Sequence, residues 1–556
     1  MPNVSQKAVR RRRSDRHGAF PGPGRAAVML AVIAPLCWLP QAALAAHTIG
    51  RLAEGAGVGE ILPGAIGFAL FGLLRAALDA LAGRLAFKSA RLELSASRDR
   101  ALAALTARSP VDISRPSSGQ AASVLAEQAE MITPWLSRYL PAKIKAMTVP
   151  FVIVAAVLPF SWIAALALLV TAPVIPLFMA LVGMRAQKAS ERQLARMGDV
   201  NAFLIDRLRG LATIRTLGAV ADTATRLRTE ADDLKRRTMT VLKIAFLTSA
   251  TLELFSALGV ALTAVYIGFH LLGFIDVGTW GTRLTLAEGL FVLMIAPAFF
   301  EPLRELSAVW HDRAAGEAAH KALSALSEQG MALPTATDTL GAGTFALCAR
   351  NLRYTHPGRE AATLDGFALS IAPGEKIAIM APSGAGKSTL LSLLAGLASP
   401  ESGAVSIFGQ DPAAARKAGE IAWVGQTAHV FSGSIAANIA LGRPEVDASA
   451  IAEALRVARL SRVAELHGRS PLGEGGTGLS GGEIVRLAVA RAAASKSARL
   501  ILADEPTAHL DAETARLVTE SLLDLARGRT LIVVTHDTEL AARMDRTVML
   551  AAEVSA

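Results

Sequence analysis

Cysteine is scarce in this chain, whose 556 residues include only Cys37, inside an apolar run, and Cys348, in a more polar half. Two isolated cysteines exclude a disulfide framework and a cysteine-based metal cluster, so both are expected to be packing residues. Aromatic residues are also few, at 5%, and are not interleaved with the basic ones. This distribution argues against a nucleic-acid partner, although the formal net charge is +10.

Apolar residues, by contrast, are abundant: they make up 52% of the chain, and the mean hydropathy is +0.40. This exceeds the usual balance of a soluble globular protein, and the length favours at least two domains. Stretches long enough to cross a bilayer as a helix, which takes about 20 residues, lie before residue 305. We predict six membrane spans, at 26–46, 60–81, 144–160, 162–184, 245–272 and 284–300. The third and fourth meet at "LPFSW", which predicts a tight hairpin.

The basic residues predict how these spans are oriented. Two long, charged stretches with helical periodicity follow the second and fourth spans, whereas the opposite connections hold one arginine each, Arg51 and Arg283. Because lysine and arginine favour the cytoplasmic side, the long stretches, the amino terminus and everything after the sixth span are expected in the cytoplasm. The run "VRRRR" before the first span also resembles a secretory signal, but cleavage there would leave an odd number of spans.

From about residue 344 short apolar strands alternate with helices, a pattern typical of an α/β domain. We predict a membrane domain over 1–325, a linker over 326–343 and an α/β domain over 344–556. In the latter, "EKIAIM", "APSGAGK" and "STLLSLL" give the strand, loop and helix of a phosphate-binding loop. The candidate loop residues are Pro382, Ser383, Gly384, Ala385, Gly386, Lys387, Ser388 and Thr389.

Each polar group of this loop has an expected task. Lys387 would reach the β- and γ-phosphates, and Ser388 would bind Mg²⁺. The pattern asks for glycine where this chain has Ala381, and alanine fits without strain if residue 381 has a negative φ. We therefore predict a working loop.

Two further stretches carry candidate residues. "RLILADEPTAHLD" is an apolar strand that ends in two carboxylates, which suits a Mg²⁺ ligand, Asp504, beside a base for an attacking water, Glu505. "LSGGEIVRLAVARAA" opens an amphipathic helix whose positive dipole end and serine hydroxyl point outward. Its first residues are Ser480, Gly481, Gly482 and Glu483.

Together, these motifs resemble an ATP-binding cassette (ABC) ATPase over nearly all of 344–550. The resemblance implies ATP and Mg²⁺ as cofactors. It also implies that Gln426 contacts the γ-phosphate and the metal, and that His536 contacts the γ-phosphate. It implies that Tyr354 or His356 stacks on adenine, and that 508–511 crosses to a partner cassette. In this family two cassettes enclose two ATP molecules, so a chain with one cassette resembles a half-transporter of the exporter type, with stretches 114–125 and 208–220 contacting the cassettes.

The membrane half narrows the resemblance. Stretches such as "FLIDRLRGLATIR" and "LTLAEGLFVLMIAPAFFEPLREL" are similar to the D subunit (CydD-type) of the thiol-reductant ABC exporter family of cytochrome bd assembly. This resemblance implies an inner-membrane heterodimer with a homologous C subunit, rather than a homodimer, that hydrolyses ATP to export cysteine or glutathione. Alternatives are haem transport in the same family, or a lipid or multidrug exporter.

Three ionisable residues lie at or near membrane depth, where their energetic cost favours a functional role: Arg75, Glu253 and Glu288. Arg75 could meet a carboxylate of the cargo. It could equally pair with Asp79, four residues further along the same helix. The sequence leaves both alternatives open.

Overall fold

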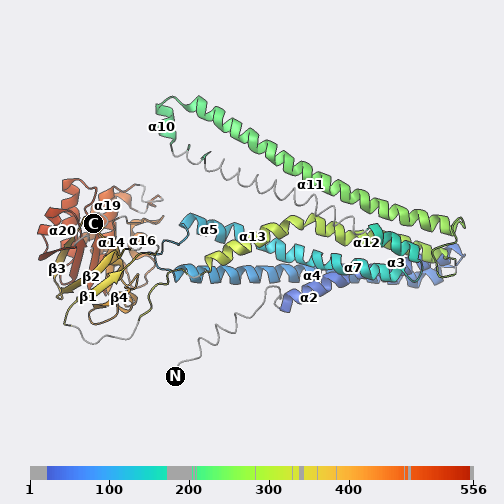
Figure 1. Ribbon diagram of the computed structural model, residues 1–556, viewed down its shortest axis with the longest axis horizontal. Coiled ribbons are helices and arrows are strands. Elements are labelled where there is room, and N and C mark those ends of the chain that lie inside the picture. The colour runs from blue at the N-terminus through green and yellow to red at the C-terminus, as the bar shows by residue number, and fades with distance from the viewer. Residues whose placement is uncertain are drawn as a thin grey trace, which may run out of the picture. The chain divides into compact units, whose positions relative to one another are not determined.

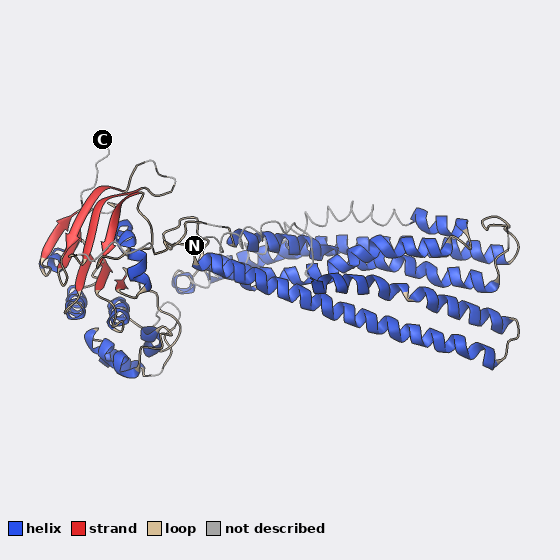
Figure 2. Cartoon of the chain, turned by 90° about the horizontal axis from the view of Figure 1, so that it is seen from below, coloured by secondary structure: helices blue, strands red, loops and turns tan. Residues whose placement is uncertain are grey.

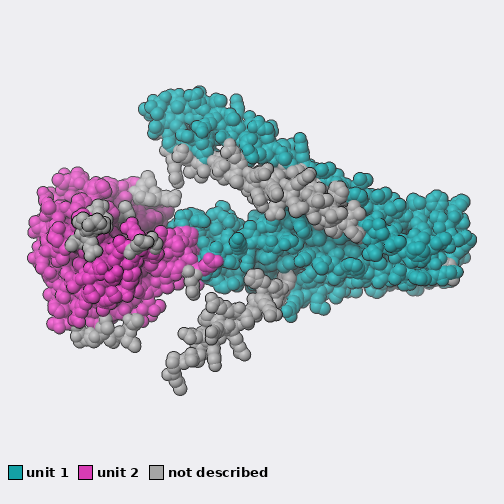
Figure 3. Space-filling model, in the orientation of Figure 1, with its two compact units in different colours: residues 1–102, 117–327 teal, residues 103–116, 328–556 magenta. Residues whose placement is uncertain are grey.

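A computed structural model describes the chain in two compact units (Figure 3), which are Met1–Leu102 with Ser117–Ser327, and Ala103–Pro116 with Glu328–Ala556. The described residues are 22–171, 203–204, 207, 210–281, 283–328, 330–336, 344–357, 359, 361–382, 385–426, 428–468, 470–473 and 478–550. Within these ranges the first unit is built from helices, and the named strands lie in the second (Figure 2).

The helices of the first unit include several long ones (Figure 1). They are α2 (Gly22–Leu36), α3 (Trp38–Ala53), α4 (Val58–Thr106), α5 (Ser118–Ala126), α6 (Ile132–Pro134), α7 (Leu140–Val157), α8 (Trp162–Thr171), α10 (Leu211–Thr216), α11 (Val220–Leu271), α12 (Leu286–Ala308) and α13 (Trp310–Leu326). A 3₁₀ turn (Gln128–Met131) and a π turn (Trp135–Tyr139) lie between α5 and α7.

Five helical runs among the described residues are long and apolar enough to cross a membrane: Gly24–Ala53, Val58–Thr106, Ser118–Val157, Glu253–Leu271 and Leu286–Leu326. They contain or overlap the predicted spans 26–46, 60–81, 144–160, 245–272 and 284–300. The predicted span 162–184 is described only over α8, and its remainder lies outside the described residues.

The predicted hairpin at "LPFSW" is present between α7 and α8. Ser161 is fully buried there, and its Oγ accepts a hydrogen bond from the N–H of Ala164 at 3.2 Å, which caps α8. The same hydroxyl donates to the carbonyl of Gly278 at 2.8 Å. The Ser161 hydroxyl thus satisfies two backbone groups where the chain reverses.

The second unit contains two sheets. An antiparallel sheet has the order β2-β1-β4, and a parallel sheet has the order β5-β6-β7-β3-β8. The strands are β1 (Leu347–Tyr354), β2 (Leu364–Ile371), β3 (Lys376–Met380), β4 (Ser402–Ile407), β5 (Ile421–Val424), β6 (Leu500–Asp504), β7 (Thr530–Val534) and β8 (Arg546–Met549). The largely apolar, buried sequences of β3, β6 and β7 are typical of parallel strands covered on both faces.

Helices connect these strands. They are α14 (Lys387–Leu394), α15 (Pro412–Lys417), α16 (Ile435–Ala440), α17 (Ala448–Val457), α18 (Ser461–His467), α19 (Gly481–Ala493), α20 (Ala512–Leu525) and α21 (Thr538–Ala542). In an open parallel sheet, ligands bind beyond the carboxyl ends of the strands. The predicted residues of the phosphate loop, Asp504, Glu505 and His536 follow or end β3, β6 and β7, which are neighbours in the sheet.

Candidate active site

The strand β3 leads into the predicted phosphate loop, and α14 begins at Lys387 with Gly386 as its amino-terminal cap. Gly386 has a φ of +86°, a left-handed conformation that L side chains rarely adopt. A Cβ at this position would lie 2.9 Å from Cγ2 and 3.0 Å from the carbonyl oxygen of Thr363. Both the backbone conformation and the close neighbour therefore require glycine at 386.

Ala381, which departs from the phosphate-loop pattern, fits the loop. Its side chain is buried in the core of the second unit, and it is not among the non-glycine residues with positive φ in the described chain. Because a Cβ causes strain only at positive φ, the condition for tolerating alanine is met. The N–H of Ala385 donates to the carbonyl of Pro382 at 3.3 Å, whereas Ser383 and Gly384 lie outside the described residues.

The ammonium group of Lys387 lies between the loop and the end of β6. Its Nζ donates to the carbonyl of Ala381 at 3.2 Å and lies 2.6 Å from Oε1 of Glu505. Both charged side chains are largely buried, with 10% and 15% of their areas exposed. A buried cation at the amino end of a helix is a favourable position for the oxygens of a phosphate chain.

Two oxygen-bearing side chains meet next to this lysine. Ser388 Oγ donates to Oδ2 of Asp504 at 3.1 Å. Burial raises the pKa of Asp504, whereas the hydrogen bond from Ser388 lowers it. Burial is the larger effect, so the pKa lies above its usual value. A partly desolvated carboxylate beside a hydroxyl is a donor set that suits Mg²⁺, which prefers oxygen ligands.

Glu505 is surrounded by three side chains with protons to donate. Besides Lys387, Nε2 of Gln426 donates to Oε2 of Glu505 at 3.5 Å, and Nδ1 of His536 lies 3.5 Å from the same oxygen. Burial alone would raise the pKa of Glu505, but the hydrogen bond and the charge of Lys387 outweigh it, so the pKa is below its usual value. The side chain is therefore a carboxylate at neutral pH and can accept a proton.

The backbone at Glu505 is also unusual. Its φ is +44°, in the left-handed region, which for a residue with a side chain costs roughly 1–2 kcal/mol. The N–H of Glu505 donates to the carbonyl of Val534 at 2.8 Å and so extends the pairing of β6 with β7 by one residue. Strain of this kind is concentrated at functional sites, where the surrounding structure maintains it.

Tyr354 and His356, the two candidate adenine partners, lie in different environments. Tyr354 ends β1 and is only 3% exposed. His356 is partly exposed, and its Nε2 lies 2.9 Å from Oγ1 of Thr389 on α14. The two rings meet edge to face, with centroids 5.1 Å apart. Of the two residues, His356 is the more exposed and is therefore the more accessible to a base.

The helix α19 begins with a reciprocal cap. The N–H of Glu483 donates to Ser480 Oγ at 3.4 Å, and the N–H of Ser480 donates to Oε2 of Glu483 at 2.7 Å. Gly481 is exposed, whereas a Cβ on Gly482 would lie 2.0 Å from Cγ2 of Thr514 on α20. Within the described residues, no hydrogen bond or ion pair joins 480–483 to the phosphate loop. The positive end of α19 is therefore available to a ligand that is not held by the phosphate loop of the same chain.

A polar cluster that no sequence motif indicated holds the segment after Gln426 in place. Arg491 on α19 donates to the carbonyls of His429, at 2.6 Å, and Asn438, at 2.8 Å, and also to Oδ1 of Asn438 at 2.7 Å. Asn438 is 1% exposed and bonds both backbone groups of Phe431. An asparagine inside the otherwise apolar helix α16 is the sequence signal that could have indicated this cluster.

A second missed feature is the segment 103–116, which clusters with the second unit. Ser109 is fully buried, and its Oγ donates to the carbonyl of Leu397 at 2.5 Å, just beyond α14. Oδ2 of Asp112 accepts from the N–H of Met331 at 3.0 Å, and its Oδ1 accepts from the N–H of Ser114 at 2.9 Å. The Asp-x-Ser turn pattern was a readable signal for this contact. The predicted contact stretch 114–125 overlaps α5, and the stretch 208–220 contains α10.

Known protein families match both halves of the chain. Residues 26–294 match the family model "ABC transporter transmembrane region", and residues 364–508 match the model "ABC transporter". The chain is 32% identical to the Haemophilus influenzae glutathione/L-cysteine transport system ATP-binding/permease protein CydD, over 94% of this chain and 90% of that protein. It is 36% identical to the Escherichia coli CydD protein, over 85% and 81%.

A solved structure gives the same fold. A bacterial Atm1-family ABC exporter with ATP bound matches 98% of this chain and 94% of its own, with a TM-score of 0.73 and 23% identity. The predicted fold class, an exporter-type membrane domain joined to an α/β ATPase domain, is confirmed.

Proposed function

This chain belongs to the ABC transporter family, with CydD-type ATP-binding/permease proteins among its relatives, and from that premise we propose that it is one half of an ATP-driven exporter of small thiols, L-cysteine and glutathione. The similarity over nearly the whole length, membrane half included, carries the proposal. An ABC ATPase domain on a membrane-embedded chain couples ATP hydrolysis to transport.

The residues at the ends of β3, β6 and β7 have complementary tasks in hydrolysis. Lys387 and the amino end of α14 would bind the phosphates, and Ser388 and Asp504 would hold Mg²⁺. The ion, when bound, neutralises charge on the phosphate oxygens. Glu505 accepts the proton of the attacking water. Gln426 and His536 hold the other carboxylate oxygen of Glu505, Oε2, in place. His356 supports the adenine.

The position of the α19 end supports a requirement for a partner chain. Ser480 and Glu483 cap their own helix and do not bond the phosphate loop of the same chain in the described residues. In a dimer, this helix end would meet the ATP held by the partner, and the partner's helix end would complete the pocket built on Lys387. We propose a heterodimer with a homologous C subunit in the inner membrane. The basic residues of the long stretches favour a cytoplasmic ATPase domain.

Transport by the purified pair in inside-out vesicles tests the proposal. We expect ATP-dependent uptake of radiolabelled cysteine and glutathione, and no uptake when the chain carries Glu505→Gln and the partner its equivalent change. Haem and a fluorescent phospholipid serve as competing cargoes. Uptake of haem or lipid without uptake of either thiol would replace the proposed cargo, while leaving the ATP-driven mechanism in place.

A further inference from the structure

Two of the three ionisable residues predicted near membrane depth have partners in the fold. Oε2 of Glu288 accepts from the N–H of Thr285 at 2.8 Å and from its hydroxyl at 2.9 Å, which caps α12. Both carboxylate oxygens of Glu253 lie 3.5 Å from Nη1 of Arg304. These contacts explain the two glutamates as structural residues, and they leave Arg75 to be explained.

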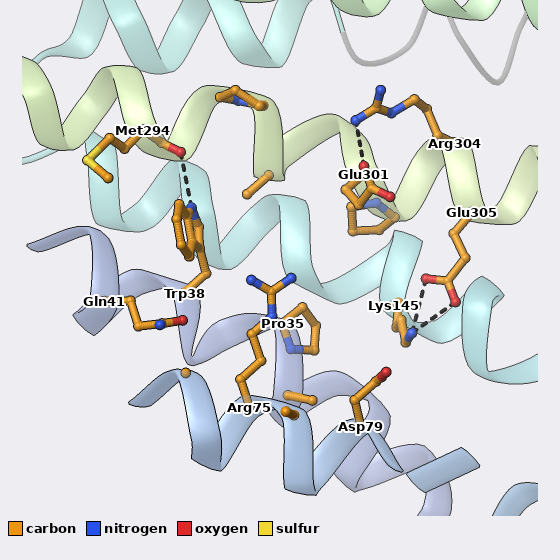
Figure 4. A pocket seen from close by; sticks show the side chains of 16 residues that line it. Pro35, Trp38, Gln41, Arg75, Asp79, Lys145, Met294, Glu301, Arg304 and Glu305 are labelled. Carbon is orange, nitrogen blue, oxygen red and sulfur yellow. Dashed lines mark hydrogen bonds and ion pairs between the residues drawn. The ribbon is translucent and has the colours of Figure 1, made fainter. Parts of the chain in front are cut away.

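Arg75 does not pair with Asp79, although the two are one helical turn apart on α4. Neither side chain makes a hydrogen bond or an ion pair with any residue in the described part of the chain. In Figure 4 both side chains point from α4 into the same cavity. Of the two alternatives that the sequence left open, the structure therefore does not contain the local pair.

The cavity lies between α2, α3, α4, α7 and α12, with a volume of about 790 Å³. Pockets for small molecules commonly measure about 300–1,000 Å³, so the size suits a peptide as small as glutathione. The other charged residues that line it are neutralised by each other. Nζ of Lys145 lies 2.9 Å from Oε1 of Glu305, and Nη2 of Arg304 lies 2.5 Å from Oε2 of Glu301.

Among the described residues that line the cavity, Arg75 and Asp79 are thus the cation and the anion that no ion pair neutralises. Both side chains are exposed on the cavity side of α4, and a charge within a membrane span is costly unless a partner compensates it. A ligand that carries one positive and one negative group would compensate both at once. Side chains four residues apart on a helix lie on the same face, with Cβ atoms about 5–6 Å apart, so both can reach a single small group.

The position of the Arg75 guanidinium is fixed by an aromatic ring. It lies over Trp38, 5.7 Å from the ring centroid, and Trp38 is held by a hydrogen bond from Nε1 to the carbonyl of Met294 at 3.0 Å. A cation–π contact does not use the N–H donors of the guanidinium as hydrogen-bond donors, so they can still bind a carboxylate. A cation held beside a ring is therefore suited to recognising a carboxylate.

We propose that Arg75 and Asp79 together bind the free α-amino acid group of the cargo, Arg75 its α-carboxylate and Asp79 its α-ammonium. This inference rests on the proposed thiol export and names its recognition element. L-cysteine and the γ-glutamyl end of glutathione share this zwitterionic group, so one clamp serves both cargoes. Recognition by the clamp does not require the thiol.

Analogues that lack one charge test the clamp in the reconstituted pair. Cysteamine lacks the carboxylate, and 3-mercaptopropionate lacks the ammonium. For the unchanged protein we expect each analogue to have a KM for uptake at least about tenfold above that of cysteine, since a site built for a polar group discriminates strongly against its absence. Arg75→Gln should raise the KM for cysteine at least about tenfold, yet change that for cysteamine less than about twofold.

Asp79→Asn should give the mirror result, with the KM for cysteine raised and that for 3-mercaptopropionate changed little. Arg84→Gln is the matched control, because Arg84 is an exposed arginine of α4 outside the cavity lining, and it should alter none of the three values. Ratios of KM within one variant are independent of how much of it folds.

Two results would overturn the clamp alone. One is an equal rise of all three KM values in either variant, and the other is uptake of 3-mercaptopropionate as efficient as that of cysteine by the unchanged protein. The second result would indicate a cargo recognised by its carboxylate only. If the unchanged pair hydrolyses ATP but takes up no thiol, the proposed cargo fails, and the clamp fails with it.

Discussion

The ammonium of Lys387 lies 2.6 Å from Oε1 of Glu505, so the cation expected to bind phosphate and the carboxylate expected to activate water contact each other. Burial raises the pKa of Glu505, and the contact with Lys387 is the main influence that lowers it. The pKa therefore lies below its usual value. Phosphate oxygens that attract Lys387 would weaken the contact, and the pKa of Glu505 would rise. A base that becomes stronger when the nucleotide is in place suits general base catalysis.

Glu505→Gln should abolish ATP hydrolysis while preserving nucleotide binding. The amide keeps the shape and can still accept a hydrogen bond, but it cannot take a proton from water. General base catalysis contributes about 10² to 10⁴ in rate, so turnover by the pair with both equivalent glutamates changed should fall by at least about a hundredfold. Glu453→Gln is the control, since Glu453 is exposed and, within the described ranges, its ion pair is with Arg456. Comparable losses in the two variants would remove Glu505 from the mechanism.

Ala381→Gly should change ATPase activity by less than about twofold, because residue 381 has no positive φ to relieve. Gly386→Ala should abolish nucleotide binding, since φ at 386 is +86° and the new Cβ would approach Thr363. Nucleotide binding and turnover of both variants are the measurements. A tenfold gain in Ala381→Gly would mean that alanine cripples the natural loop.

Asp112→Ala should loosen the attachment of 107–116 to 330–333. The hydrogen bond from the Ser114 hydroxyl chiefly lowers the pKa of Asp112, with backbone N–H groups of Ser114 and Met331 adding to it. Hydrogen bonds to a charged group contribute roughly 1.5–3 kcal/mol, so the Met331 amide should exchange with deuterium at least about tenfold faster. Asp365→Ala, which removes an exposed ion pair with Arg353, should leave this amide unchanged.

The effect of pH on this attachment has a definite sign. A folded-state pKa below the unfolded value means that the stabilisation is present above the unfolded pKa and is lost as pH falls through the folded one. Protection of the Met331 amide, corrected for the intrinsic exchange rate, should therefore be constant from about pH 7 to 5 and decline only below about pH 4. A decline centred near neutrality would contradict the assignment to Asp112.

Gly482→Ala should separate α19 from α20, because its Cβ would lie 2.0 Å from Cγ2 of Thr514. Overpacking of this kind costs about 1–3 kcal/mol, and a lower melting temperature with reduced ATPase activity is expected. Adding Thr514→Ala removes the obstructing methyl group and should restore the melting temperature. Failure of the second change to restore it would show that the close approach of the two helices is not the cause.

The motifs of the second unit could be predicted from sequence because each is a continuous stretch with its own local structure. The strand, loop and helix around Lys387 and the cap formed by Ser480 and Glu483 are local patterns, and both are present. The choice between Tyr354 and His356 could not be made, since burial depends on packing between elements. The predicted spans agree with described helices where the apolar runs are long. Of the fourth predicted span, only the part that forms α8 lies in the described range.

The contacts that could not be predicted from the sequence join residues far apart in the chain. The bond between Ser109 and Leu397 connects segments 288 residues apart, and that between Arg491 and His429 spans 62. Whether Arg75 pairs with Asp79 or points into a cavity depends on helices α3, α7 and α12. No pattern on α4 alone could distinguish these outcomes.

Accumulation of labelled cysteine in inside-out vesicles that contain the chain and its homologous partner is the most direct test of ATP-driven thiol export. With ATP and Mg²⁺ we predict an internal concentration above the external one, and with a non-hydrolysable ATP analogue, or with both catalytic glutamates changed to glutamine, no accumulation. Accumulation that is equal with and without hydrolysable ATP, or none at all by a pair that hydrolyses ATP, would contradict it.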